Sequence, residues 1–139
     1  MVWFNVDDGF HSHPKSQQLT LGAVGLWTLA GSWCSRHLTD GDIPEHVLIR
    51  LSPCSPRQTK THAAELVHAR LWDTTCHGWH FHDWLAHQRS KEDVEADREA
   101  NRVRQARLRA KRRAAKAGDE PSDSEGGEPS NVSPLRSRA

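Results

Sequence analysis

Apolar residues recur at helical spacing in a long stretch near the N-terminus. From about Leu19 to Leu38 they lie three or four residues apart, which places them on one face of a helix: Ala23, Leu26, Trp27, Ala30, Trp33, Cys34 and His37. We therefore expect a long amphipathic helix, with His37 as a hydrogen-bonded core residue. Gly22 and Gly25 lower the helix propensity and leave room for another element to approach closely.

Two shorter helices are predicted after a sharp turn. The Asp40-Gly41 pair marks the turn, and Ile43 follows it as a single apolar anchor. Proline suits the first position of a helix, so the next helix is expected from Pro44 to about Leu51. Ser55 and Gln58 have the spacing of a capping box, which predicts a third helix over about 56–70.

β-structure is predicted before and after these helices. In residues 2–7, Val2, Phe4 and Val6 alternate with Trp3, Asn5 and Asp7, which favours a strand, and Asp8-Gly9 then turns the chain. Residues 71–74 and 79–84 are two β-rich runs on either side of a turn that contains glycine, which predicts a hairpin. A helix-turn-helix followed by a hairpin is the layout of a winged helix. The expected fold class is therefore α+β and mainly helical.

Composition and charge divide the chain into three regions. All six Trp and all three Phe precede residue 88, so residues 1–88 are expected to form the winged helix-turn-helix domain. The formal charges of this region sum to −2, those of residues 89–117 to +6, and those of residues 118–139 to −3. We expect residues 89–117 to form a charged, basic helical arm and residues 118–139 to be a disordered acidic tail.

Several motifs together resemble one group of proteins. They are Val2–Ser12, Gly25-Leu26-Trp27, Ala30–Trp33, Leu38–Gly41 and Phe81–Trp84. As a set they resemble small helix-turn-helix proteins of actinobacterial phages and prophages, related to the N-terminal winged-helix domain of phage replisome organisers and replication initiators. The resemblance covers about residues 1–90 and implies DNA binding in replication initiation or transcriptional regulation. It departs at residues 52–56, where the family commonly has a short glycine-rich turn.

The third helix is the expected reading helix, and the hairpin is the expected wing. The N-terminal residues of a reading helix reach base edges in the major groove. Gln58 could pair with adenine and Arg57 with guanine, Thr59 and Thr61 offer hydroxyls, and Lys60 and His62 would face the DNA backbone.

The arm is the expected source of non-specific affinity for double-stranded DNA. Residues 100–117 hold eight bases and no acid, and contacts to phosphates supply most of that affinity. The predicted contacts are Arg102, Arg104, Arg107, Arg109, Lys111, Arg112 and Arg113. Two alternatives remain open. The domain could instead dock a replication or transcription protein while the arm binds an acidic partner, or the arginine-rich arm could bind RNA or single-stranded DNA.

Metal and catalytic chemistry have little support in the sequence. Cys76, His77, His80 and His82 are the only cluster of candidate zinc ligands, but no second ligand pair at a recognised spacing closes a site. Nucleotide-binding, serine-hydrolase and metalloprotease motifs are missing. We expect no cofactor, no bound metal and no enzyme activity.

The sequence also predicts a location. It contains no membrane-spanning apolar run and no signal-peptide pattern, and its three cysteines are widely spaced. We expect the cytoplasm of a bacterial host and no membrane partner.

Overall fold

The predicted long helix is present as helix α2 (Leu21–His37) in the computed structural model, which describes residues 1–119. The Thr20 hydroxyl caps its N-terminus by accepting the backbone N–H of Ala23. The predicted apolar face is buried at Ala23, Leu26, Trp27, Ala30 and Cys34, and Trp33 is partly buried. The expectation for His37 is wrong. Its ring bonds to the Trp33 carbonyl and stacks on the Trp33 ring at 4.6 Å, so it is satisfied on the exposed surface, outside the core.

Strand β1 (Asp42–Pro44) is a short element that the sequence analysis missed. It pairs antiparallel with β3 (Gly78–Phe81), and β3 pairs antiparallel with β2 (Trp72–Thr74), so the sheet order is β1-β3-β2. Three residues are too few for an alternating pattern to be recognised. The apolar residue at the centre of β1, Ile43, is nevertheless fully buried. The predicted hairpin is confirmed, although its second strand ends at Phe81.

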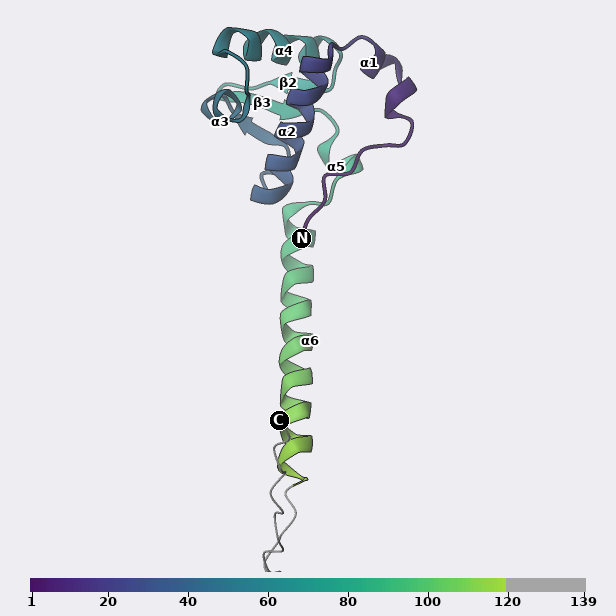
Figure 1. Ribbon diagram of the computed structural model, residues 1–139, viewed down its shortest axis with the longest axis vertical. Coiled ribbons are helices and arrows are strands. Elements are labelled where there is room, and N and C mark those ends of the chain that lie inside the picture. Colours follow the sequence, from purple (N-terminus) through teal and green to yellow (C-terminus); the bar gives the residue numbers. More distant parts are fainter. Residues whose placement is uncertain (120–139) are drawn as a thin grey trace, which may run out of the picture. The chain divides into compact units, whose positions relative to one another are not determined.

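Helices α3 (Glu45–Leu51) and α4 (Pro56–His68) confirm the predicted helix pair. Pro44 is the N-cap of α3, one residue before its predicted position, and the capping box of Ser55 and Gln58 begins α4. Helix α2 packs against α3 and α4, and α4 also packs against β2. The protein is therefore α+β and mainly helical, with α2, α3 and α4 gathered around a small antiparallel sheet (Figure 1).

The N-terminal segment is not the predicted strand. Residues 1–7 have no regular structure, and a short 3-10 turn η1 (Phe10–Ser12) and helix α1 (Pro14–Gln17) follow. The Gln88 side-chain amide accepts the Asn5 N–H at 3.0 Å and donates to the Asn5 carbonyl at 2.7 Å. Because a side chain satisfies both groups, the segment needs no strand partner, and Phe4 still packs against the core.

Two helices follow the hairpin, α5 (Trp84–His87) and α6 (Lys91–Ala117). At the start of α6 the Ser90 hydroxyl accepts the Asp93 N–H, the Asp40 carboxylate accepts the Lys91 N–H at 2.7 Å, and Val94 is buried. Contacts divide the chain into one unit of residues 1–100 and a second from residue 101 onward. The predicted helical arm is thus a helix. Residues 120–139, nearly all of the predicted tail, lie outside the described residues. No helix within residues 1–119 is long and apolar enough to cross a membrane.

Glycines in α2 differ in what lies next to them. A Cβ at Gly31 would lie 2.3 Å from the Phe4 ring, and one at Gly22 would lie 2.5 Å from the His62 ring. The predicted close approach is therefore right for Gly22. At Gly25 nothing lies within 4 Å, so the expectation for that residue is wrong. Gly31, which the sequence does not single out, is the position in α2 against which the Phe4 ring of the N-terminal segment packs.

This difference predicts opposite effects of the same substitution at two places in one helix. We expect Gly25→Ala to raise the free energy of unfolding by about 0.5–1 kcal/mol, the gain of replacing an exposed helical glycine. We expect Gly31→Ala to lower it, because overpacking against Phe4 costs about 1–3 kcal/mol and exceeds the helix gain. Urea unfolding of both variants measures this. Equal stabilisation by the two would show that Phe4 does not rest on Gly31.

Candidate nucleic-acid interface and pocket

The first turns of α4 present part of the predicted reading surface. Pro56 occupies the first turn, and the Ser55 hydroxyl accepts the backbone N–H of Gln58 while the side-chain amide oxygen of Gln58 accepts the backbone N–H of Ser55. This reciprocal cap explains why the helix begins at this point. Arg57, Gln58 and Thr61 are exposed, and the Thr61 hydroxyl donates to the Arg57 carbonyl at 3.0 Å. These three side chains are therefore exposed, with the Gln58 Oε1 and the Thr61 hydroxyl proton engaged within the start of the helix.

Thr59 does not offer its hydroxyl to a ligand, which corrects the expectation from sequence. Its side chain is fully buried, and its hydroxyl contacts the Ser52 hydroxyl at 2.7 Å and donates to the Ser55 carbonyl at 2.9 Å. The position faces inward because the apolar stripe of α4 continues four and seven residues later at Ala63 and Leu66, both fully buried.

Lys60 and His62 both have partners within the protein. Lys60 is exposed and pairs with Glu45 of α3 at 2.6 Å. His62 lies against Gly22 and bonds to Glu65 at 3.0 Å, so it is turned toward α2. Burial raises the pKa of Glu65, but hydrogen bonds from Thr20 and His62 outweigh it and lower the pKa overall. His62 therefore contributes to the α2–α4 contact, and the expectation that it faces DNA loses support.

The hairpin carries two histidine–aspartate pairs. His77 Nε2 in the turn lies 2.9 Å from Asp42 Oδ2 of β1, and His82 Nδ1 lies 2.8 Å from Asp73 Oδ2 of β2. Each histidine thus has its own carboxylate. Among residues 1–119 there is no group of three or more His, Cys, Asp or Glu side chains placed to hold a metal ion.

All seven predicted basic contacts of the arm, and the eighth base Lys116, lie in α6 and are exposed. The stretch from residue 100 to 117 contains no acid. One contact within it is donated by the Arg104 guanidinium to the side-chain Oδ1 of Asn101 at 3.2 Å. In contrast, an acid in the first part of α6 has a partner within the protein, because Asp97 pairs with Arg89 at 2.6 Å. The basic part therefore presents a continuous run of cationic side chains.

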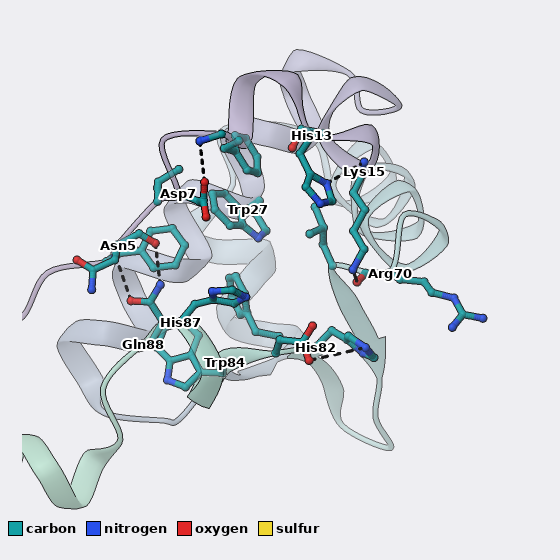
Figure 2. A pocket seen from close by; sticks show the side chains of 18 residues that line it. Asn5, Asp7, His13, Lys15, Trp27, Arg70, His82, Trp84, His87 and Gln88 are labelled. Atoms are coloured by element: carbon teal, nitrogen blue, oxygen red, sulfur yellow. Dashed lines mark hydrogen bonds and ion pairs between the residues drawn. The ribbon is translucent and has the colours of Figure 1, made fainter.

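A pocket of about 380 Å³ lies between the N-terminal segment, the end of α4 and α5 (Figure 2). One part of its wall is aromatic: Phe4, Phe10, Trp27, Phe81 and Trp84. The rest includes polar side chains: Asn5, Asp7, His13, Lys15, His82, Asp83, His87 and Gln88. Figure 2 shows the Gln88 side chain bonded to the Asn5 backbone at one side and Lys15 reaching the Arg70 carbonyl, at 3.1 Å, on another.

The volume of this pocket lies within the range of small-molecule sites. The sequence does not reveal this pocket, because its walls come from four segments that only the folded chain brings together. The one available signal was the aromatic content of the first 88 residues, which indicates a core but does not locate a hollow.

Comparisons with known proteins place no constraint on this geometry. The chain matches no protein-family model, no curated protein sequence and no solved structure.

The geometry at the hairpin turn predicts how His77 titrates. Its hydrogen bond to Asp42, together with its contact to Cys76, raises the pKa of His77 above the ordinary 6.5. Because the pKa is raised in the folded state, the pair stabilises the fold fully at pH values below 6.5. This stabilisation is lost as the pH rises through the folded-state pKa.

An NMR titration of the histidine ring protons measures this. We expect Asp42→Asn to bring the His77 midpoint down toward 6.5. Asp73→Asn, which removes the partner of His82, should leave that midpoint unchanged. A wild-type midpoint at or below 6.5 would contradict the pairing.

Proposed function

We propose that the protein binds double-stranded DNA as a winged helix-turn-helix protein with a basic arm. The observation that carries the proposal is the exposed run of eight bases without an acid in the last part of α6. Such a run is more than solubility requires, and its natural ligand is a polyanion. The resemblance of residues 1–90 to phage helix-turn-helix proteins favours replication initiation, with transcriptional regulation second.

The order of elements in the first unit supports the winged-helix part of the proposal. A helix, a strand, two helices and a hairpin follow one another, and the strands pair in the order β1-β3-β2. In this arrangement α4 is the reading helix and the β2–β3 hairpin is the wing. Arg57, Gln58 and Thr61 are the residues of α4 that we assign to DNA, whereas Thr59 is left out because it is buried.

The two parts have different tasks in this mechanism. The first 88 residues have a formal charge of −2, so they cannot supply strong phosphate affinity alone. The arm supplies the electrostatic attraction, which is independent of sequence and sensitive to salt. Helix α4 then supplies base contacts: the Arg57 guanidinium suits guanine, and the Gln58 amide suits adenine.

The salt dependence of duplex affinity tests the role of the arm. Contacts to five to eight phosphates predict a log–log slope of roughly −4.5 to −7, since each contributes about −0.9. Replacing Arg107, Arg109, Arg112 and Arg113 together by Gln should reduce the slope by up to about 3.6 on the same basis. The control is Arg36→Gln, which removes an exposed charge near the end of α2.

A wild-type slope near zero would overturn duplex binding. If the same slope and a higher affinity appear with single-stranded DNA or RNA, the arm is a single-strand binder. If the chain binds neither nucleic acid at low salt, the protein-docking alternative takes its place.

Base reading by α4 is tested by Gln58→Glu. Glutamate is accepted at the third position of a capping box, so the helix start is kept. The substitution removes the amide donor and adds a negative charge toward DNA, and we expect a loss of about 1–3 kcal/mol at the preferred site. Gln18→Glu makes the same charge change on the exposed end of α1 and serves as the control. Equal losses for the two variants, measured by fluorescence anisotropy at fixed salt, would contradict a specific role for α4.

A further inference from the structure

Three side chains at the turn of the hairpin form a connected series. Cys76 is exposed, and its Sγ lies 3.3 Å from His77 Nδ1. On the other side of the same ring, His77 Nε2 lies 2.9 Å from Asp42 Oδ2. A thiol, an imidazole and a carboxylate are therefore aligned, with the imidazole between the other two.

The carboxylate determines which nitrogen of the imidazole can act as a base. Ionised Asp42 only accepts hydrogen bonds, so Nε2 must carry a proton to bond with it. In the neutral ring Nδ1 is then the unprotonated nitrogen, and it faces the Cys76 thiol. This is the geometry by which a histidine activates a nucleophile while a carboxylate orients the histidine.

Backbone contacts hold the turn in this arrangement. The Glu45 N–H donates to the His77 carbonyl at 2.9 Å, and the Thr75 N–H donates to the Gly78 carbonyl at 2.9 Å. The backbone of β1 approaches Gly78 so closely that a Cβ there would lie 2.0 Å from the Ile43 carbonyl oxygen. Asp42 and His77 come from segments 35 residues apart, and this close pairing of β1 with β3 brings them together.

We propose that Cys76 is a modification site, a thiol that reacts with low-molecular-weight disulfides such as glutathione disulfide, with His77 as its base and Asp42 as a positioning residue. His77 Nδ1 takes the thiol proton, and the Cys76 sulfur attacks one sulfur of the disulfide. A protein–glutathione disulfide forms, the original S–S bond breaks, and the departing thiolate takes up a proton to leave as glutathione.

The other two cysteines lack this environment. Cys34 is fully buried, and burial raises the pKa of its thiol to about 11, so little thiolate forms near neutral pH. Cys54 is half-buried, and its hydrogen bond runs from its backbone N–H to the Ser52 hydroxyl. The reaction is therefore specific to Cys76, and Cys54 serves as an internal reference.

The reaction of the folded, full-length protein with 5,5′-dithiobis(2-nitrobenzoate) tests the proposal. A positioned base contributes about 10²-fold or more in enclosed sites. For this open turn we expect Cys76 to react at least about tenfold faster than Cys54, a lower bound on the same principle. Cys76→Ser should abolish the fast phase, and Cys54→Ser should leave it unchanged.

Variants of the other two residues separate base catalysis from simple exposure. His77→Gln should slow the fast phase by about tenfold, as expected for loss of the base. His46→Gln, a histidine exposed on α3, should not affect it. Asp42→Asn should lower both the reaction rate of the Cys76 thiol and the titration midpoint of His77. Asp42→Glu should restore both in part. Equal rates for Cys76 and Cys54, or an unchanged rate in a folded His77→Gln protein, would overturn the proposal.

Glutathione disulfide itself identifies the product. Mass spectrometry of the treated protein should find one glutathione on the peptide that contains Cys76, and adducts spread over Cys54 and Cys76 would count against the site. Its effect on DNA rests on the proposed function: a glutathione of net negative charge on the wing should weaken duplex binding. If Cys76 reacts as expected but duplex affinity is unchanged, the thiol site is supported. The same result contradicts DNA contact by the wing.

Discussion

The first unit of this protein depends on the contacts of the Phe81 ring. It lies at the end of β3 and meets Trp72 of β2 at 5.6 Å, Trp84 of α5 at 5.0 Å and Trp27 of α2 at 6.1 Å. Phe4 of the N-terminal segment reaches the same ring at 5.9 Å. Four segments therefore meet at one aromatic side chain, two of them (α2 and the N-terminal segment) distant from it in sequence, and offset or edge-on ring contacts stabilise this packing beyond burial alone.

This aromatic cluster connects the fold to the pocket and to the hairpin turn that carries Cys76 and His77. On one side, Phe81 and three of the rings around it (Phe4, Trp27 and Trp84) also line the pocket, so the pocket is a part of the core that remains open between the N-terminal segment and α5. On the other side, strand β3, which ends at Phe81, begins at Gly78, where the backbone of β1 approaches closely. That approach places Asp42 beside His77 and produces the series of thiol, imidazole and carboxylate at the hairpin turn.

The features that the sequence predicted correctly are those decided by local rules. The capping box at Ser55, the apolar face of α2, the hairpin and the helical arm each depend on residues within a few positions of one another. The errors have a common cause: tertiary contacts overrode what the local pattern predicted. The alternation in residues 2–7 resembles a strand, but the Gln88 side chain takes the backbone groups of Asn5. Thr59 is in a polar run, but the face of α4 on which it lies points inward.

The amino-acid sequence by itself determined the helices, the hairpin and the separation of a near-neutral domain from a basic arm, because propensity, capping and charge are properties of short stretches of chain. Only the tertiary structure decided which polar residues are available. It buried Thr59, turned His62 toward α2 and left Arg57 and Gln58 exposed. It also formed the pocket and joined Asp42 to His77 and Cys76, because such contacts depend on how close distant segments come when the core packs.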